Sequence, residues 1–157
     1  MTSIARPMSH PLQGKIALVT GGAKGFGLGI AQSLAEAGAR VWITGRDQAA
    51  LDQAARGNAL TAIRADVTSP ADWDRVLEVI TQNAGRLDIL VNNAGAMGQP
   101  HLLEISESEW DHVLGVNLKG PNRTHQWPHA YGNDPKDGAH NNRRTKLLYT
   151  GVFRGEN

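Results

Sequence analysis

The decisive stretch of this sequence reads Thr20-Gly21-Gly22-Ala23-Lys24-Gly25-Phe26-Gly27. Directly before it, the apolar residues 16–20 predict a short buried strand. After it, apolar residues recur at helical spacing until Gly38, which predicts a helix that ends at this glycine. Glycines at such a junction allow a sharp turn, and the helix start behind them offers free backbone N–H groups and a partial positive charge. The stretch therefore predicts a pyrophosphate site, with a purely structural turn as the alternative.

The alternation of strand and helix continues downstream. Three further strands are predicted at residues 40–44, 60–65 and 87–91. The helices behind these strands are predicted to begin at N-cap residues, which are Asp47, Ser69 and Ser106. Near-continuous apolar strands between helices are typical of a parallel sheet covered on both faces. We predict an α/β fold with a doubly wound parallel sheet, truncated after the fourth strand and its following helix.

The composition of the 157 residues excludes several classes of protein. The chain has no cysteine, which excludes a disulfide scaffold, a thiol nucleophile and a cysteine-ligated metal. The net charge of +1 gives no overall field that would attract nucleic acid or an anionic membrane. No apolar run reaches the length of about 18 residues that a membrane span needs. We expect a cytoplasmic protein without a metal site or membrane contact, and a flexible N-terminal arm over residues 1–13.

Further motifs follow the predicted strands. Asp66-Val67 comes after the third strand, Asn92-Asn93-Ala94-Gly95 comes after the fourth, and Asn117 lies in the last predicted helix. Each motif alone has an ordinary explanation as a turn, a cap or a surface residue. Together with the glycine stretch, and in this order, they resemble the short-chain dehydrogenase/reductase family over about residues 15–120. The resemblance implies a Rossmann-like domain at residues 14–120 that binds NAD or NADP.

The resemblance also assigns roles to individual residues. It implies that the glycine stretch meets the cofactor through Thr20, Gly21, Lys24, Gly25, Phe26 and Gly27. It implies that the adenine and its ribose lie beside Asp66, Val67, Asn93, Ala94 and Gly95. Asn117 matches the helix asparagine of the family's catalytic tetrad. The expected partner is therefore a nicotinamide dinucleotide.

The end of the second predicted strand bears on which dinucleotide binds. Family members that use NAD usually place an acidic residue there, whereas this sequence has Gly45 followed by Arg46. Arg46 and Lys24 can both reach a 2′-phosphate. Asp47 lies near the spacing of a ribose-binding acid, but we interpret it as the N-cap of the next helix. The sequence favours NADP over NAD, with two ordinary surface cations as the alternative.

The family's chemistry, as the resemblance implies it, is hydride transfer between nicotinamide and a carbonyl or alcohol group. It uses a tyrosine, a lysine four residues later and a serine on the preceding strand. The last serine here is Ser108, and the residues four positions after Tyr131 and Tyr149 are Pro135 and Phe153. We therefore expect an NAD(P)-dependent oxidoreductase by descent that is inactive as given. A small-molecule substrate is expected only if a full-length form exists.

The sequence changes character at Gly120/Pro121. Residues 1–120 carry a net charge of −2, whereas residues 121–157 carry +3 and show no hydrophobic period beyond the run at 147–149. We predict that residues 121–157 are a disordered basic tail outside the family, which arose from a reading-frame change or from divergence. The fourth strand would then be an open edge, which predicts self-association and exposure of Trp110, Val113 or Leu114.

Two alternative functions remain open at this stage. The chain can be a non-catalytic nucleotide-binding fragment, or a protein that binds a partner through its basic tail. A nucleic-acid site is disfavoured, because no aromatic platform or fold accompanies the small basic cluster Arg143-Arg144-Thr145-Lys146.

Overall fold

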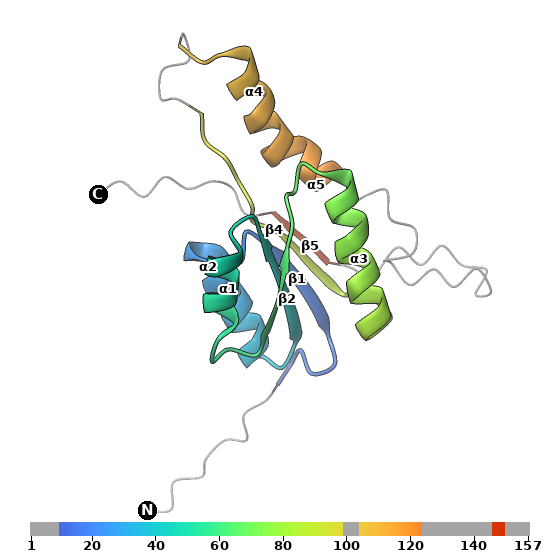
Figure 1. Cartoon of the computed structure of the whole chain (residues 1–157). Helices are drawn as coiled ribbons and strands as arrows, with labels where there is room; N and C mark the ends of the chain where they lie inside the picture. Colours follow the sequence, from blue (N-terminus) through green and yellow to red (C-terminus); the bar gives the residue numbers. More distant parts are fainter. Residues whose placement is uncertain (1–9, 99–103, 124–145, 150–157) are drawn as a thin grey trace, which may run out of the picture.

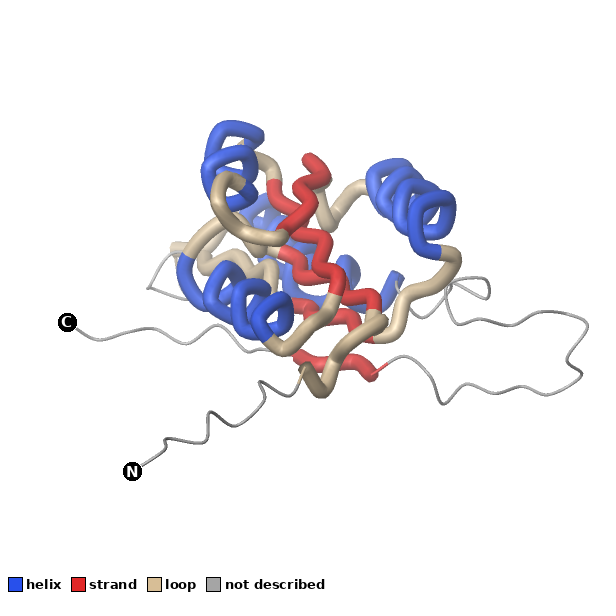
Figure 2. Tube along the Cα trace, turned by 90° about the horizontal axis from the view of Figure 1, so that it is seen from below, coloured by secondary structure: helices blue, strands red, loops and turns tan. Residues whose placement is uncertain are grey.

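The structure is a computed structural model that describes residues 10–98, 104–123 and 146–149. These residues form a parallel sheet between helices (Figures 1 and 2). The strand order is β3-β2-β1-β4-β5, and each neighbouring pair is parallel. The strands are β1 Ile16–Thr20, β2 Arg40–Gly45, β3 Leu60–Arg64, β4 Ile89–Asn92 and β5 Lys146–Tyr149. The predicted α/β class and the order of the first four strands are therefore confirmed.

The helices begin where their capping residues predict. The elements are α1 Gly25–Glu36, α2 Gln48–Ala55, α3 Pro70–Ala84, α4 Glu107–Leu114, the π-helix η1 Gly115–Lys119 and α5 Gly120–Arg123. The side chains of Asp47, Ser69 and Ser106 each accept a hydrogen bond from a backbone N–H in the first turn of the helix that follows. Gly85 ends α3 with a φ of 73°, which glycine adopts without steric strain.

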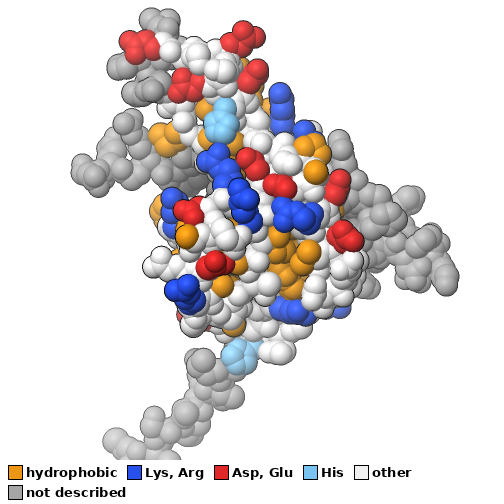
Figure 3. All heavy atoms as spheres, viewed as in Figure 1, with side chains coloured by type: hydrophobic (Ala, Val, Ile, Leu, Met, Phe, Trp, Pro, Cys, Tyr) orange, Lys and Arg blue, Asp and Glu red, His pale blue; other side chains and the backbone are white. Residues whose placement is uncertain are grey.

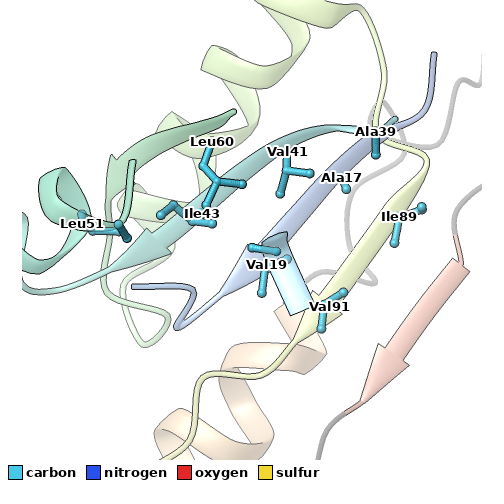
Figure 4. Close-up of a cluster of buried hydrophobic side chains, with 11 residues drawn as sticks. Ala17, Val19, Ala39, Val41, Ile43, Leu51, Leu60, Ile89 and Val91 are labelled. Carbon is cyan, nitrogen blue, oxygen red and sulfur yellow. The ribbon is translucent and has the colours of Figure 1, made fainter. Parts of the chain in front are cut away.

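Apolar side chains fill both sides of the sheet, because successive residues of a strand point to opposite faces. On one face, Ala17 and Val19 of β1 belong to a cluster completed by Ala31 of α1 and Leu51 of α2 (Figure 4). On the other face, Leu18 packs in a cluster with residues of α3, which are Trp73, Val76 and Ile80. Burial of each large apolar side chain contributes about 1.5–3 kcal/mol, so this double core stabilises the sheet.

The prediction that β4 is an open edge is wrong. Strand β5 pairs with it in parallel, and Ile89 aligns with Lys146 while Val91 aligns with Leu148. Pairing uses backbone groups, so the short apolar run at 147–149 suffices to continue the sheet once β4 offers unpaired N–H and C=O groups. The predicted self-association through an edge of β4 therefore loses its basis.

Other predictions about the chain ends have mixed outcomes. Residues 11–13, assigned to the flexible arm, form a turn together with Gly14, and the backbone N–H of Leu12 donates to the Ala37 carbonyl at 2.9 Å. The predicted boundary at Gly120/Pro121 falls within α5 and stays a prediction. The rest of the arm and most of the tail, residues 1–9, 124–145 and 150–157, lie outside the described residues.

Helix α4 extends away from the sheet (Figure 1). None of its residues is buried, and Trp110 is 47% exposed. The predicted exposure of Trp110 is therefore observed, although the open edge from which it was derived is absent. Within the described residues, no helix has the length and apolar character that a membrane crossing requires.

Candidate functional site

A pocket of about 390 Å³ lies at the carboxyl ends of the first four strands. Its walls come from the segments that follow β1, β2, β3 and β4, together with η1. The lining residues are Gly21, Ala23, Lys24, Gly45, Arg46, Asp47, Ala50, Ala65, Asp66, Val67, Asn93, Ala94, Gly95, Ala96 and Val116. In open α/β sheets, ligands bind at this edge, beside the strands where the connections switch from one face to the other.

Two hydrogen-bonded side chains join the loops that follow β1 and β4. The Thr20 hydroxyl accepts from the backbone N–H groups of Asn93 and Ala94, both at 3.0 Å. The side-chain amide of Asn93 donates back to the carbonyls of Thr20 and Gly21, at 2.9 and 3.1 Å. These bonds fix the glycine loop against the loop after β4, so one wall of the pocket is held from two strands.

Glycines are required in this loop for two reasons. Gly21 and Gly25 have φ values of 64° and 55°, in the left-handed region that side chains disfavour. A Cβ on Gly27 would overlap the Gly21 carbonyl oxygen and the Asn93 amide nitrogen. Lys24 caps α1 with its backbone extended and makes no side-chain capping bond, so it leaves the first-turn N–H groups available to an anion.

Two cations and one engaged carboxylate line one part of the pocket. Lys24 and Arg46 carry the positive charges, and the Arg46 carbonyl accepts from Arg64 Nε at 3.1 Å. Asp47 is the predicted N-cap, because its Oδ1 accepts from the backbone N–H of Ala50 at 3.1 Å. Figure 3 shows Lys and Arg side chains below α4 with Asp and Glu side chains among them, and further Asp and Glu side chains at the top of the view.

The loop after β3 contributes an ionised carboxylate. Burial alone would raise the pKa of Asp66, but hydrogen bonds from the Thr68 backbone and hydroxyl and the charge of Arg46 outweigh it and lower the pKa. The Asp66 backbone N–H donates to Asp72 Oδ2 at 2.8 Å, which fixes the loop to α3. At neutral pH, Asp66 therefore presents a carboxylate that accepts hydrogen bonds.

Asn117, the helix asparagine, does not line the pocket itself, but it bonds to Ala96, which does. Asn117 Oδ1 accepts from the Ala96 N–H at 2.9 Å, and its Nδ2 donates to the Ala96 carbonyl at 2.8 Å. Asn117 lies in η1, which also contributes the buried lining residue Val116. Asn117 is exposed, as the surface alternative requires, but both its polar side-chain atoms also bond to the backbone of Ala96.

The pocket unites most of the candidate residues that the sequence singled out. Those in the lining are Gly21, Lys24, Arg46, Asp66, Val67, Asn93, Ala94 and Gly95. Thr20 and Gly27 are buried beside it, whereas Gly25 and Phe26 are exposed, with Phe26 at 75%. The sequence interpretation missed Ala23, Gly45, Ala50, Ala65, Ala96 and Val116 as lining residues, and it gave Asp47 a capping role only. In the sequence, only their position next to a motif residue or a strand end could have indicated that these residues line the pocket. Among the described residues, no three His, Asp or Glu side chains gather in a way that would hold a metal ion.

Comparison with known proteins relates the chain to a family. A model of the short chain dehydrogenase family matches residues 15–128. Over 112 residues, the chain is 42% identical to galactitol 2-dehydrogenase of Agrobacterium fabrum, a match that covers 70% of this chain and 44% of that protein. Over 116 residues, it is 46% identical to the rhamnolipids biosynthesis 3-oxoacyl-[acyl-carrier-protein] reductase of Pseudomonas aeruginosa, with 69% and 45% covered.

A solved structure shares the fold. The 3-ketoacyl-(acyl-carrier-protein) reductase of Brucella melitensis, crystallised with NADH, superimposes with a TM-score of 0.74 at 37% identity. The match covers 81% of this chain and 54% of the reductase. The chain thus spans less than half the length of the two curated relatives.

Proposed function

Because the chain belongs to the short-chain dehydrogenase family, we propose that its pocket binds a nicotinamide dinucleotide and prefers NADP to NAD. One observation carries the proposal: a single pocket combines the glycine loop, two cations and the Asp66 carboxylate at the carboxyl edge of the sheet. When bound, such a cofactor supplies a hydride or accepts one. The residues of this chain bind and orient it.

The residues around the pocket suit the successive parts of a dinucleotide. The pyrophosphate would be held by the glycine loop and the uncapped first turn of α1. The adenosine ribose would lie along Asn93, Ala94 and Gly95, and the adenine beside Asp66 and Val67. The volume of about 390 Å³ falls within the usual range of ligand pockets.

The preference for a 2′-phosphate rests on charge. Lys24 and Arg46 line the pocket, and a guanidinium can bind a phosphate through two parallel hydrogen bonds. The lining holds two carboxylates: that of Asp47 is engaged as the cap of α2, and that of Asp66 accepts hydrogen bonds from Thr68. Asp47 is therefore a weaker competitor for ribose hydroxyls than a free acid at the end of β2 would be.

The class of reaction that we propose from membership in the family is hydride transfer to or from an alcohol or carbonyl group. The names of the relatives refer to galactitol and to 3-oxoacyl-[acyl-carrier-protein], so the proposal goes no further than this class of group. Asn117 is the one tetrad residue present, since the sequence has no serine after Ser108 and no Tyr-x-x-x-Lys. The proposed role of these 157 residues is therefore cofactor binding without turnover.

Titration calorimetry on the full chain tests the proposal. We expect NADP⁺ to bind more tightly than NAD⁺. Loss of one charged contact costs about 1.5–3 kcal/mol, so Arg46→Ala should weaken NADP⁺ binding about 10- to 100-fold. NAD⁺ binding should change less than about twofold. Arg56→Ala, an exposed cation just after α2, is the charge-matched control.

Two results would count against the proposal in different ways. Equal affinities of the unmodified chain for NADP⁺ and NAD⁺ would refute the 2′-phosphate assignment. Absence of binding to either dinucleotide, with the chain folded by circular dichroism, would refute the binding function itself.

A further inference from the structure

Thr68 acts on one oxygen of the Asp66 carboxylate with two donors. Its hydroxyl donates to Asp66 Oδ1 at 2.7 Å, and its backbone N–H donates to the same atom at 2.8 Å. Within the described part of the chain, Asp66 Oδ2 accepts no hydrogen bond. Thr68 itself is absent from the pocket lining, whereas Asp66 is part of it. The arrangement leaves one carboxylate oxygen for a ligand.

The methyl group of Thr68 has its own contact. Its Cγ2 lies 3.5 Å from the position that a Cβ on Gly115 would occupy, so the methyl packs over the start of η1. Asp66 is also fixed from its other side, because its backbone N–H donates to Asp72 and Asp72 forms an ion pair with Arg75 at 2.7 Å. The hydroxyl therefore faces Asp66 while the methyl faces η1, and a β-branched side chain holds such a rotamer firmly.

We infer that Thr68 is a positioning residue that fixes Asp66 Oδ2 for the exocyclic amine of an adenine base. The inference rests on the proposed function, which places the adenine beside Asp66. A carboxylate only accepts hydrogen bonds, and the 6-amino group of adenine is a donor, so the two groups are complementary. A carboxylate locked through Oδ1 pays less rotational entropy on binding than a free one, because its plane is already set.

A pair of substitutions separates the hydroxyl from the methyl. Thr68→Val keeps the branched shape against Gly115 and removes the hydroxyl donor to Asp66, while the backbone N–H donor remains. Thr68→Ser keeps the donor and removes the methyl. Thr61→Val, on an exposed position of β3, is the matched control for the loss of a threonine hydroxyl.

The experiment compares NADP⁺ with its deamino analogue, in which a carbonyl oxygen replaces the 6-amino group. Calorimetry on the full chain should show that Thr68→Val weakens NADP⁺ binding about three- to tenfold. The same variant should change the affinity for the deamino analogue less than about twofold. The ratio of the two affinities, which favours NADP⁺ in the unmodified chain, should therefore decrease. Thr68→Ser should restore the preference, and Thr61→Val should match the unmodified chain.

Three outcomes would overturn the inference while the proposed function stands. The first is that Thr68→Val weakens the binding of both ligands equally, which would indicate a general structural role. The second is that Thr68→Ser loses the preference for the amino form as Thr68→Val does, which would assign the effect to the methyl group. An unchanged preference in Thr68→Val would remove the role altogether. If the unmodified chain binds neither ligand, the proposed function fails and the inference fails with it.

Discussion

The side-chain amide of Asn117 pairs with both backbone polar groups of Ala96, at 2.9 Å from the N–H and 2.8 Å to the carbonyl. Ala96 follows β4 and lines the pocket, whereas Asn117 lies on η1, 21 residues further along the chain. The backbone N–H of Gly120 closes the π-helical turn on the Gly115 carbonyl. Single π-helical turns inside α-helices occur frequently at functional sites. Here the turn carries the residue that holds a wall of the pocket.

Asn117→Ala should destabilise the chain by about 1–2 kcal/mol, because two neutral hydrogen bonds at an exposed site are lost. Asn117→Asp should also destabilise it, because a carboxylate cannot donate to the Ala96 carbonyl. Urea unfolding followed by circular dichroism measures both effects. Asn83→Ala, which loses one intrahelical bond to Val79, is the control. A loss for Asn117→Ala no larger than that of Asn83→Ala would contradict the prediction.

Local patterns predicted most of the fold. The helix starts at Asp47, Ser69 and Ser106 were predictable, because N-capping depends on residues three apart in the sequence. The four strands were predictable because a sheet buried on both faces needs uninterrupted apolar runs. Strand β5 was missed, because its four residues carry no pattern that distinguishes a strand from a short apolar run in a loop.

The site was predictable where it relies on motifs and unpredictable where it relies on packing. The glycine loop and the residues after β3 and β4 follow strand ends, so the parallel topology brings them together. Ala96 and Val116 have no chemical signature, and they enter the lining only because η1 lies against the loop after β4. The bond from Thr68 to Asp66 depends on a rotamer, which a sequence pattern does not specify.

Gly27→Ala and Gly29→Ala should have opposite effects on stability, although both lie in α1. A Cβ at Gly27 would overlap Gly21 and Asn93, so overpacking should cost about 1–3 kcal/mol and should displace the glycine loop. A Cβ at Gly29 meets no atom within 4 Å, so the variant should gain up to about 1 kcal/mol from helix propensity.

Thermal unfolding and NADP⁺ titration measure this pair. Gly27→Ala should lose dinucleotide binding, whereas Gly29→Ala should keep it, because the glycine loop is undisturbed. Loss of stability in Gly29→Ala, or tolerance of Gly27→Ala, would show that the packing of α1 on the loop differs from the structure described.

Stability should fall on the acid side through Asp66 and Asp72. Hydrogen bonds from the Asp66 backbone and Arg75 lower the pKa of Asp72, and the balance at Asp66 also lowers its pKa. A carboxyl group with a lowered folded-state pKa stabilises the fold above its unfolded pKa of about 4, and this contribution is lost as the pH falls through the folded-state value. The free energy of unfolding should therefore decrease as the pH falls below about 5, because the unfolded state takes up protons at a higher pH than the folded state.

Asp66→Asn should reduce this acid dependence, because one of the two titrating groups is removed. Urea unfolding at a series of pH values measures the slope, and Asp74→Asn, an exposed carboxylate of α3, controls for net charge. If the slope in Asp66→Asn equals that of the unmodified chain, Thr68 and Arg46 do not lower the pKa of Asp66 in the folded state.

The chain of 157 residues should not oxidise alcohols or reduce carbonyl compounds with NADP(H) or NAD(H). Hydride transfer at these groups needs a proton donor or acceptor beside the reacting oxygen, and the amide of Asn117 does not ionise. The sequence has no Tyr-x-x-x-Lys to supply that group and no serine after Ser108. The assay follows nicotinamide absorbance with a sugar alcohol and a 3-oxoacyl thioester, and the Gly27→Ala variant sets the background. Turnover clearly above that background would show that other residues of the chain perform the proton transfer.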